Sequence, residues 1–252
     1  MAEKQKKRRM MVNWWIPVAV NTIASLLAFS LSLLVNEHSR TEAKKVTASN
    51  IAQVTLSNID EVANNLEIVT TYYDEFIDLH NTIRSYKNYK DVPDSICKEF
   101  VDYVEGWDIF AINKAPELTF STTFELWDYL ENIPLIRRIG NCYAYENAFL
   151  ELYNRDQATI VRLTSEAGLE KIIDKRQKMA TLVNNAAFVN YMSRADAMSA
   201  AYHSLLERIR RANNLNKEDM GVSDEDLRNL VAPKHMAEDA HEDYLFVVGP
   251  DM

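Results

Sequence analysis

The sequence predicts an all-α protein with one N-terminal transmembrane helix, a long amphipathic stalk helix and an up-and-down helical bundle. Three observations predict this fold. Residues 14–35 carry no charged side chain, apolar residues recur at helical spacing between residues 59 and 83, and the 252 residues include only five glycines and six prolines. Because glycine and proline punctuate strands and turns, their scarcity favours long helices.

The first 35 residues predict a basic cytoplasmic tail (residues 1–12) and a transmembrane helix (residues 13–35). The 22 uncharged residues from Trp14 to Val35 would extend about 33 Å as a helix, against a hydrocarbon core of about 30 Å. Trp14 and Trp15 stand at its start, where aromatic rings prefer the headgroup level. The basic tail predicts a cytoplasmic N-terminus, so we expect a single-pass signal-anchor protein of the bacterial inner membrane with an extracytoplasmic, periplasmic domain.

A cleaved signal peptide is the alternative interpretation of this segment. Signal peptides have an apolar core of about 7–15 residues that ends at a pair of small residues. Here the apolar run continues to Val35, beyond Ala28 and Ser30, which are the only plausible small pair. The length therefore favours an uncleaved anchor.

Small and polar residues share one face of the expected span. They are Asn21, Ala24, Ser25, Ala28 and Ser32. Such a face allows two helix backbones to approach closely, and an asparagine can hydrogen-bond across the contact. The pattern favours a helix that pairs in the membrane, although alanine and serine are also common in membrane helices that do not pair.

Residues 36–92 are expected to form the stalk, which is also the first bundle helix. Its apolar seam alternates spacings of three and four and comprises Ile59, Val62, Leu66, Val69, Tyr73, Phe76, His80 and Ile83. No glycine or proline occurs between residues 36 and 92, so one helix is expected to run to about Ser85. The seam suits a bundle core or a coiled coil between copies of the chain, and the large Tyr73 and Phe76 favour the bundle.

Residues 93–232 are expected to complete the bundle, followed by an acidic C-terminal tail at residues 233–252. A helix is expected after Pro93, and Thr122 with Glu125 forms a capping box that opens a helix over 124–130. A long helical pattern follows beyond Pro134, and a further helix is expected over 188–211. Ser223 with Asp226 then opens a short helix to Leu230. Residues 244–248 suit a strand or an extended tail.

The chain resembles uncharacterised single-span bacterial envelope proteins. The resemblance depends on a short basic tail, a span that begins with tryptophan, an amphipathic helix rich in Asn and Asp, and a later pattern. That pattern is Phe124-x-x-x-x-x-Leu130…Ile136…Ile139-Gly140-Asn141…Tyr145. The resemblance covers about half of the chain, implies the membrane topology, and implies no activity.

Candidate ligand groups are few. Cys97 and Cys142 could form a disulfide outside the cytoplasm, or could be two buried thiols. His80 lies on the apolar seam, which favours a buried, hydrogen-bonded histidine. His235 and His241 lie among acidic residues, but their spacing matches no zinc motif and indicates a solvated tail. The polar residues 214–221 faintly resemble a calcium loop, but lack its closing glutamate and indicate a polar connection.

Charge and motif content exclude several function classes. Residues 1–12 hold five basic side chains against Glu3, so the rest carries 23 of 28 basic and 36 of 37 acidic residues, a balance of −13. Such a domain is repelled by phosphate backbones, so we expect no nucleic-acid partner. No phosphate-binding glycine loop, Gly-x-Ser-x-Gly turn or dinucleotide fingerprint occurs, so we expect no cofactor and no catalytic residues.

The sequence therefore favours a non-enzymatic, membrane-anchored helical binding domain. It would act as a scaffold, a sensor or a subunit of an envelope membrane complex. Its expected partners are the lipid bilayer, another membrane or envelope protein, and a second copy of the chain. The alternative is a membrane-anchored hydrolase that uses a metal or paired carboxylates.

Overall fold

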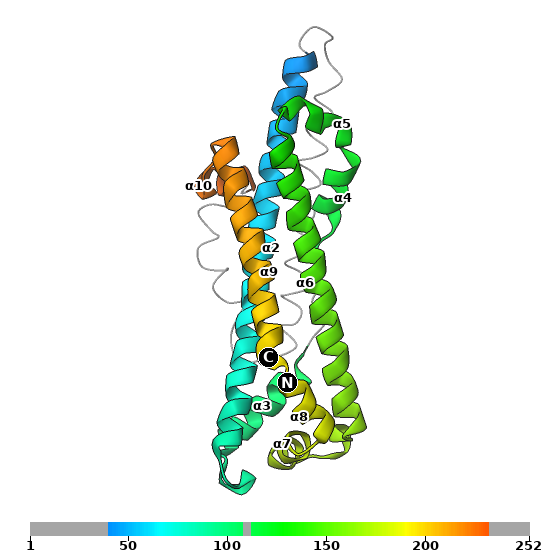
Figure 1. Ribbon diagram of the computed structural model, residues 1–252, viewed down its shortest axis with the longest axis vertical. Coiled ribbons are helices and arrows are strands. Elements are labelled where there is room, and N and C mark those ends of the chain that lie inside the picture. Colours follow the sequence, from blue (N-terminus) through cyan, green and yellow to red (C-terminus); the bar gives the residue numbers. More distant parts are fainter. Residues whose placement is uncertain (1–39, 108–111, 232–252) are drawn as a thin grey trace, which may run out of the picture. The chain divides into compact units, whose positions relative to one another are not determined.

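The computed structural model describes residues 40–107 and 112–231 (Figure 1). Every regular element in these two stretches is helical, and they contain no strand, so the prediction of an all-α helical bundle is confirmed. The described chain divides into two compact units. Unit 1 comprises residues 40–61, 112–143 and 210–231, and unit 2 comprises residues 62–107 and 144–209.

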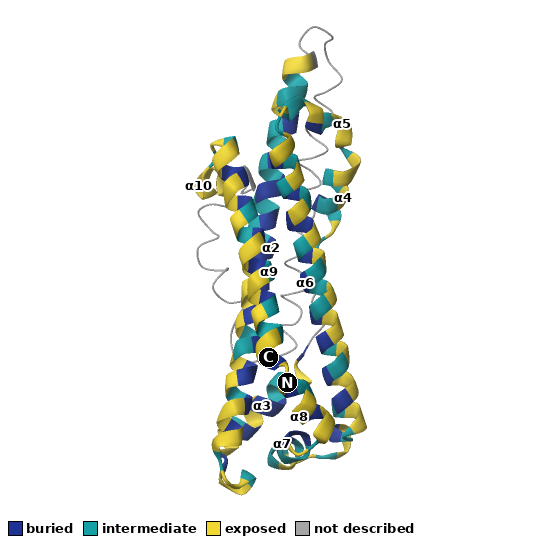
Figure 2. Ribbon diagram, viewed as in Figure 1, coloured by how far each residue is buried: buried dark blue, intermediate teal, exposed yellow. Residues whose placement is uncertain are grey.

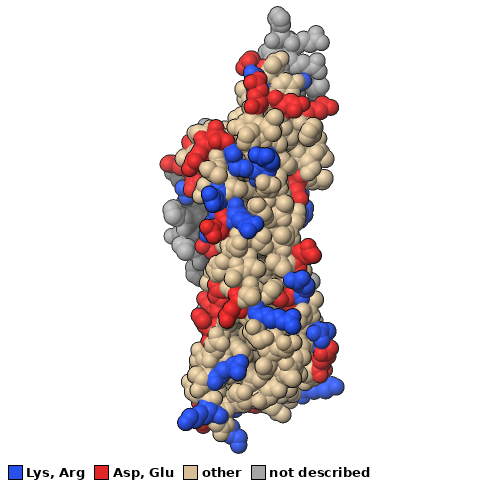
Figure 3. Space-filling view, viewed as in Figure 1, with Lys and Arg blue, Asp and Glu red and all other residues tan. Residues whose placement is uncertain are grey.

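The α-helices are α2 (Arg40–Ser85), α3 (Asp94–Glu105), α4 (Ala115–Thr122), α5 (Phe124–Trp127), α6 (Ile133–Glu166), α7 (Lys175–Val183), α8 (Ala186–Met192), α9 (Ala195–Met220) and α10 (Asp224–Val231). Three short 3-10 helices are η1 (Tyr89–Asp91), η2 (Asp128–Leu130) and η3 (Leu169–Lys171). Helices α2, α6 and α9 contribute residues to both units. On the face shown in Figure 3, acidic and basic side chains are interspersed with uncharged surface.

Helix α2 is 46 residues long and ends at Ser85, where the sequence predicted its end. Its continuity follows from the absence of glycine and proline, the residues that most often interrupt a helix. Along the predicted seam, Val69 is half-buried and the remaining residues are buried within this one chain (Figure 2). Their burial agrees with the intramolecular bundle, and pairing between copies stays a prediction.

The core of unit 2 is built from aromatic rings. Phe76 of α2 stacks on Phe100 of α3 with ring centroids 5.7 Å apart, and meets Trp107 edge-on at 5.5 Å. Phe188 of α8 lies edge-on to Phe76 at 6.5 Å and to Phe100 at 6.0 Å. Aromatic pairs at such separations contribute about 0.5–1.5 kcal/mol each beyond the burial of their area. These rings therefore join α2, α3 and α8 into one core.

Local capping divides the later helices of unit 2 more finely than the sequence predicted. Gly168 adopts a left-handed conformation (φ 65°) just after α6 ends, which a residue with a Cβ adopts only with strain. Asp174 then caps α7 by accepting a bond from the backbone N–H of Gln177 at 2.7 Å, and Asn185 caps α8. The long pattern beyond Pro134 is thus divided into α6 and η3, and α7 follows as a separate helix.

Two further predictions are wrong. The helix expected over 188–211 is interrupted, because α8 ends at Met192 and α9 begins at Ala195. The polar stretch 214–221 is not a connection, because α9 continues to Met220. Its asparagines belong to the last turns of a helix, and the left-handed Gly221 (φ 64°) follows the helix end.

Unit 1 is organised around Trp127. Its side chain is 2% exposed, packs with Ile51 and Ala52 of α2, and donates a hydrogen bond from Nε1 to the carbonyl of Phe120 at 2.8 Å. Figure 1 shows α4 and α5, which carry Phe120 and Trp127, beside the beginning of α2. The indole therefore fixes the α4–α5 segment to α2.

The helix starts predicted from Thr122 with Glu125 and from Ser223 with Asp226 have opposite outcomes. Ser223 and Asp226 form the reciprocal pair, because Ser223 Oγ accepts from the Asp226 N–H at 3.2 Å and the Asp226 carboxylate accepts from the Ser223 N–H at 2.8 Å. Thr122 caps nothing, since its hydroxyl donates to the carbonyl of Leu118 at 2.9 Å. The next helix, α5, begins after Thr123 without a side-chain cap.

None of the described helices combines the length and apolar character needed to cross a membrane. The predicted transmembrane helix over residues 13–35 lies outside the described residues, as does its small-residue face at Asn21, Ala24, Ser25, Ala28 and Ser32. The basic tail (1–12) and the acidic tail (233–252), with His235, His241 and the expected extended segment 244–248, lie outside them too.

Candidate functional site

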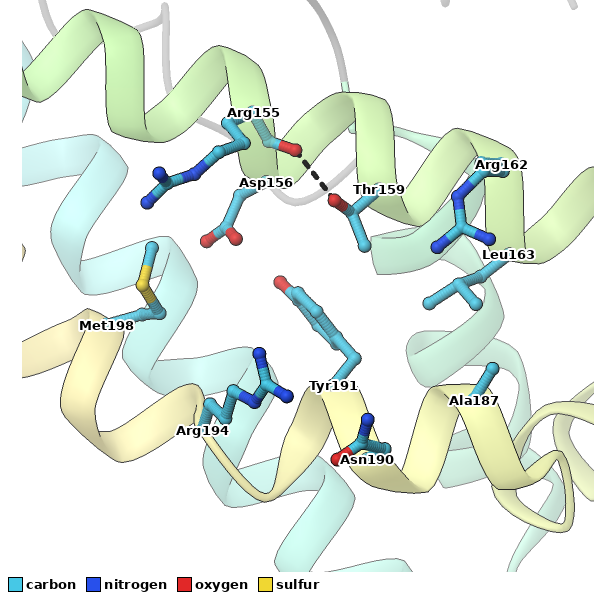
Figure 4. Close-up of a pocket in the computed structure, with 10 residues that line it drawn as sticks. All are labelled: Arg155, Asp156, Thr159, Arg162, Leu163, Ala187, Asn190, Tyr191, Arg194 and Met198. Carbon is cyan, nitrogen blue, oxygen red and sulfur yellow. Dashed lines mark hydrogen bonds between the residues drawn. The ribbon is translucent and has the colours of Figure 1, made fainter.

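Unit 2 contains a pocket between α6 and the α8–α9 segment, with a volume of about 560 Å³. Figure 4 shows side chains from α6 on one side and from α8, the α8–α9 link and α9 on the other. The lining residues are Arg155, Asp156, Thr159, Arg162, Leu163, Ala187, Asn190, Tyr191, Arg194 and Met198. This lining contains three guanidinium groups and one carboxylate, so it favours an anion.

Asp156 is the carboxylate of the pocket, and it is buried and already hydrogen-bonded. The residue is 5% exposed, and its Oδ2 accepts a bond from the hydroxyl of Tyr202 at 2.9 Å. The hydroxyls of Tyr73 and Tyr191 lie 3.4 Å apart, and both also stabilise the ionised carboxylate. Three phenols from α2, α8 and α9 therefore surround one carboxylate of α6.

Burial and mutual charge raise the pKa values of Asp156 and of the tyrosines around it. Burial raises the pKa of Asp156 above its ordinary value, and the tyrosine hydroxyls and Arg155 oppose only part of that rise. Burial, followed by the nearby Asp156 carboxylate, raises the pKa of Tyr202, and burial with Tyr73 and Asp156 raises that of Tyr191. The phenols therefore remain neutral donors at physiological pH.

The three arginines of the pocket differ in what they contact. Arg162 bonds Glu166 one turn later on α6 at 2.9 Å, and both side chains are more than half exposed. Among the described residues, the guanidinium groups of Arg155 and Arg194 form no ion pair. Figure 4 shows Arg155 and Arg162 reaching from α6 and Arg194 from the α8–α9 link. The pocket thus has an excess of positive charge at its exposed side.

Unit 1 contains a second polar cluster, centred on Lys217 of α9. Its ammonium group contacts Asp60 at 3.0 Å and Asp224 at 2.8 Å, and Asp60 also accepts a bond from Asn213 at 2.7 Å. The Asn213 amide also donates to the carbonyl of Leu56 at 2.9 Å. Burial lowers the pKa of Lys217, but the bonds to Asp224 and Asp60 outweigh that effect and raise it. This cluster joins α2, α9 and α10, and we assign it a structural role.

We expect Lys217→Met to destabilise the protein by about 2 kcal/mol, because it leaves Asp60 without its cation in a largely buried setting. The Lys217 side chain is 11% exposed and that of Asp60 is 30% exposed. Urea unfolding of the purified full-length protein, followed by circular dichroism, measures the change. Lys45→Met is the matched control, since Lys45 pairs with Glu131 on the surface of the same unit and should cost under about 1 kcal/mol. Equal losses in the two variants would contradict the structural role of the cluster.

The residues singled out from the sequence are mostly structural in this setting. Of the seam, only Tyr73 contributes to the group around Asp156. Cys97 and Cys142 are both buried thiols, so the candidate disulfide is not formed in this structure. His80 is buried as expected, but its Nε2 has no hydrogen-bond partner among the described residues. In those residues, no group of three or more His, Cys, Asp or Glu side chains is arranged to hold a metal ion.

The pocket residues gave no recognisable signal in the sequence. Arg155 and Arg162 lie on a charged helix face that is typical of solvated surface, and Arg194 belongs to a helix break that was not predicted. Asp156 differs from any other helix carboxylate only because three tyrosines from distant segments surround it.

Comparisons with known proteins give no relative from which a role for the pocket could be inferred. No family model, no curated protein and no solved structure matches the chain.

Proposed function

We propose that this chain is a non-enzymatic, membrane-anchored helical binding domain that serves a complex of the bacterial envelope as scaffold, sensor or subunit. The observation that carries the proposal is the pocket of unit 2, in which Arg155 and Arg194 have no ion-pair partner among the described residues. Charged groups held beside a cavity without a partner are suited to binding a ligand of opposite charge. The one carboxylate there is bonded by tyrosine hydroxyls.

The membrane anchor in this proposal is the uncharged segment 14–35, which follows five basic residues. Its length matches the hydrocarbon core of a bilayer, and its basic flank supports a cytoplasmic N-terminus. The helical domain would then lie on the extracytoplasmic side. Its partners would be the bilayer and a membrane or envelope protein that contacts the small-residue face of the span or the helical domain.

The anchor is tested by extracting membranes with alkaline carbonate after expression of the full-length protein. We expect the wild type to stay in the membrane pellet and Leu27→Arg to be depleted from it, since an arginine near the centre of a span costs about 3 kcal/mol. Val46→Arg is the matched control, because Val46 is an exposed apolar residue of α2 and should not change the distribution. A wild type that carbonate releases would refute the anchor.

The role in a complex is tested by copurification. A tagged full-length protein is extracted in mild detergent and its particle mass and copurifying proteins are determined. We expect a stoichiometric partner, or a second copy of the chain. A lone monomer with no partner would contradict the scaffold and subunit roles.

A carboxylate-based hydrolase is the second candidate, and the raised pKa of the Asp156 carboxyl favours it. A general acid needs such a pKa, but it also needs access to the substrate, and Asp156 is 5% exposed. Hydrolysis of phosphoester, glycoside and peptide substrates by the wild type, lost in Asp156→Asn, would establish this alternative in place of the binding role.

A further inference from the structure

The three arginines of the unit 2 pocket line it from two sides. Arg155 and Arg162 are seven residues apart on α6, which places them on the same helix face about 10 Å apart. Thr159 lies between them on that face, and its hydroxyl donates to the carbonyl of Arg155 at 2.8 Å. Arg194 approaches from the α8–α9 link on the opposite side of the cavity (Figure 4).

Arginines on exposed helices are ordinary, and what distinguishes these three is that they come from separate segments and line one cavity of about 560 Å³. Two of them, Arg155 and Arg194, form no ion pair in the described chain, and the charge of Arg155 acts on Asp156 without a direct contact. The third, Arg162, bonds Glu166 on a surface where both side chains remain more than half exposed, so a ligand can replace that contact. The neutral side-chain amide of Asn190 adds a donor to the same lining.

The carboxylate of Asp156 does not cancel the preference of the pocket for an anion. It lies at the buried side of the pocket, where the Tyr202 hydroxyl bonds it at 2.9 Å and Tyr73 and Tyr191 also stabilise it. The pocket therefore separates a satisfied carboxylate inside from guanidinium groups outside. An oxyanion that presents several acceptor oxygens matches the outer part best, because guanidinium groups bind phosphate through paired hydrogen bonds.

We propose that the pocket between α6 and the α8–α9 segment binds a phosphate monoester, held by Arg155, Arg162 and Arg194. This inference rests on the proposed binding function and names the class of its ligand. The phosphate group belongs either to a soluble phosphorylated molecule or to a lipid whose headgroup is a phosphate monoester, as in phosphatidic acid, and the shared chemistry is a terminal phosphate with up to two negative charges.

The test is isothermal titration calorimetry of the full-length protein in a neutral detergent. One titration uses glycerol 3-phosphate, and a second uses short-chain phosphatidic acid, with short-chain phosphatidylcholine as the lipid control. We expect saturable binding of at least one phosphate monoester and none of phosphatidylcholine. Affinities within about tenfold of each other would indicate a soluble ligand, and much tighter binding of phosphatidic acid would indicate a lipid headgroup.

Variants locate the binding in the pocket. We expect the double variant Arg155→Ala, Arg194→Ala to weaken binding at least about tenfold, since it removes both guanidinium groups that lack an ion pair. Arg137→Ala, an exposed arginine of α6 in unit 1, should bind like the wild type. Circular dichroism melting confirms that each variant is folded, and Arg155→Lys with Arg194→Lys provides a second pair that keeps the charge and removes the planar donor geometry.

Each outcome bears on the phosphate site separately from the membrane role. Absence of binding in both titrations up to about 10 mM, or equal binding by the wild type and the folded double alanine variant, would overturn the site. Either result would leave the anchor and the copurifying partner intact. Release of the wild type by carbonate would refute the anchor without changing the titrations.

Discussion

Phe76→Ala is expected to lower the free energy of unfolding by about 3–5 kcal/mol, the usual cost of removing a large aromatic ring from a core. The residue is fully buried and contacts Phe100, Trp107 and Phe188. Truncation loses these contacts and leaves a cavity where α2, α3 and α8 meet. Urea unfolding of the purified full-length protein, followed by circular dichroism, measures the loss.

Ile173→Ala is the matched control for this variant. Ile173 is also a large apolar residue of unit 2, but it is 96% exposed, so its truncation should change stability by less than about 0.5 kcal/mol. A comparable loss in both variants, or a loss below about 1 kcal/mol for Phe76→Ala, would mean that the aromatic cluster is not the core of unit 2.

Acidification is expected to destabilise the protein through His80. Burial, and then the charge of Arg84, lowers the pKa of His80 from 6.5 to about 4, although a bond to Asn81 opposes the shift. The fold therefore prefers the neutral imidazole, and the unfolded chain takes up a proton first. The contribution is fully present above about pH 6.5 and is lost progressively as the pH falls to about 4, by up to about 3 kcal/mol.

The comparison that isolates this effect is between the wild type and His80→Gln, with urea unfolding measured from about pH 7 to about pH 4. Carboxylates also titrate over this range, so the effect of His80 is the difference in unfolding free energy between the two proteins at each pH. We expect the stability of the wild type to fall more steeply. His203→Gln, which changes an exposed histidine bonded to Asp74, should follow the wild type. Parallel curves for the wild type and His80→Gln would refute the role of His80.

The fold class could be predicted because one signal was strong over a long distance. The alternating spacing from Ile59 to Ile83, together with the absence of glycine and proline, determines both the course of α2 and its buried face. The break at Ser193 and Arg194 could not be predicted in the same way, because neither residue prevents helix formation. There, the N-cap at Asn185 and the packing of Phe188 into the core set the direction of α8.

The candidate site could not be predicted, because its properties arise only from tertiary packing. Tyr73 was expected on the apolar seam and Tyr202 lies within the helix expected over 188–211, and nothing in the sequence indicates that both reach the same carboxylate. Asp156 has the same local pattern as a solvated helix residue, and its burial is decided by segments far from it in the chain. Thr122 shows the same limit for local motifs, since its hydroxyl bonds the preceding helix instead of capping the next one.

The two buried cysteines give each unit its own reporter of local opening. Cys97 belongs to unit 2 and Cys142 to unit 1, and burial raises the pKa of the Cys97 thiol. Because the thiolate is the form that reacts with alkylating reagents, a folded chain protects both side chains. In variants that keep a single cysteine, the alkylation rate therefore measures how often that unit opens, without any label being introduced. Ligand binding in the arginine pocket would slow the reaction at Cys97, and the logarithm of the rate would fall in proportion to the free energy that binding adds to unit 2.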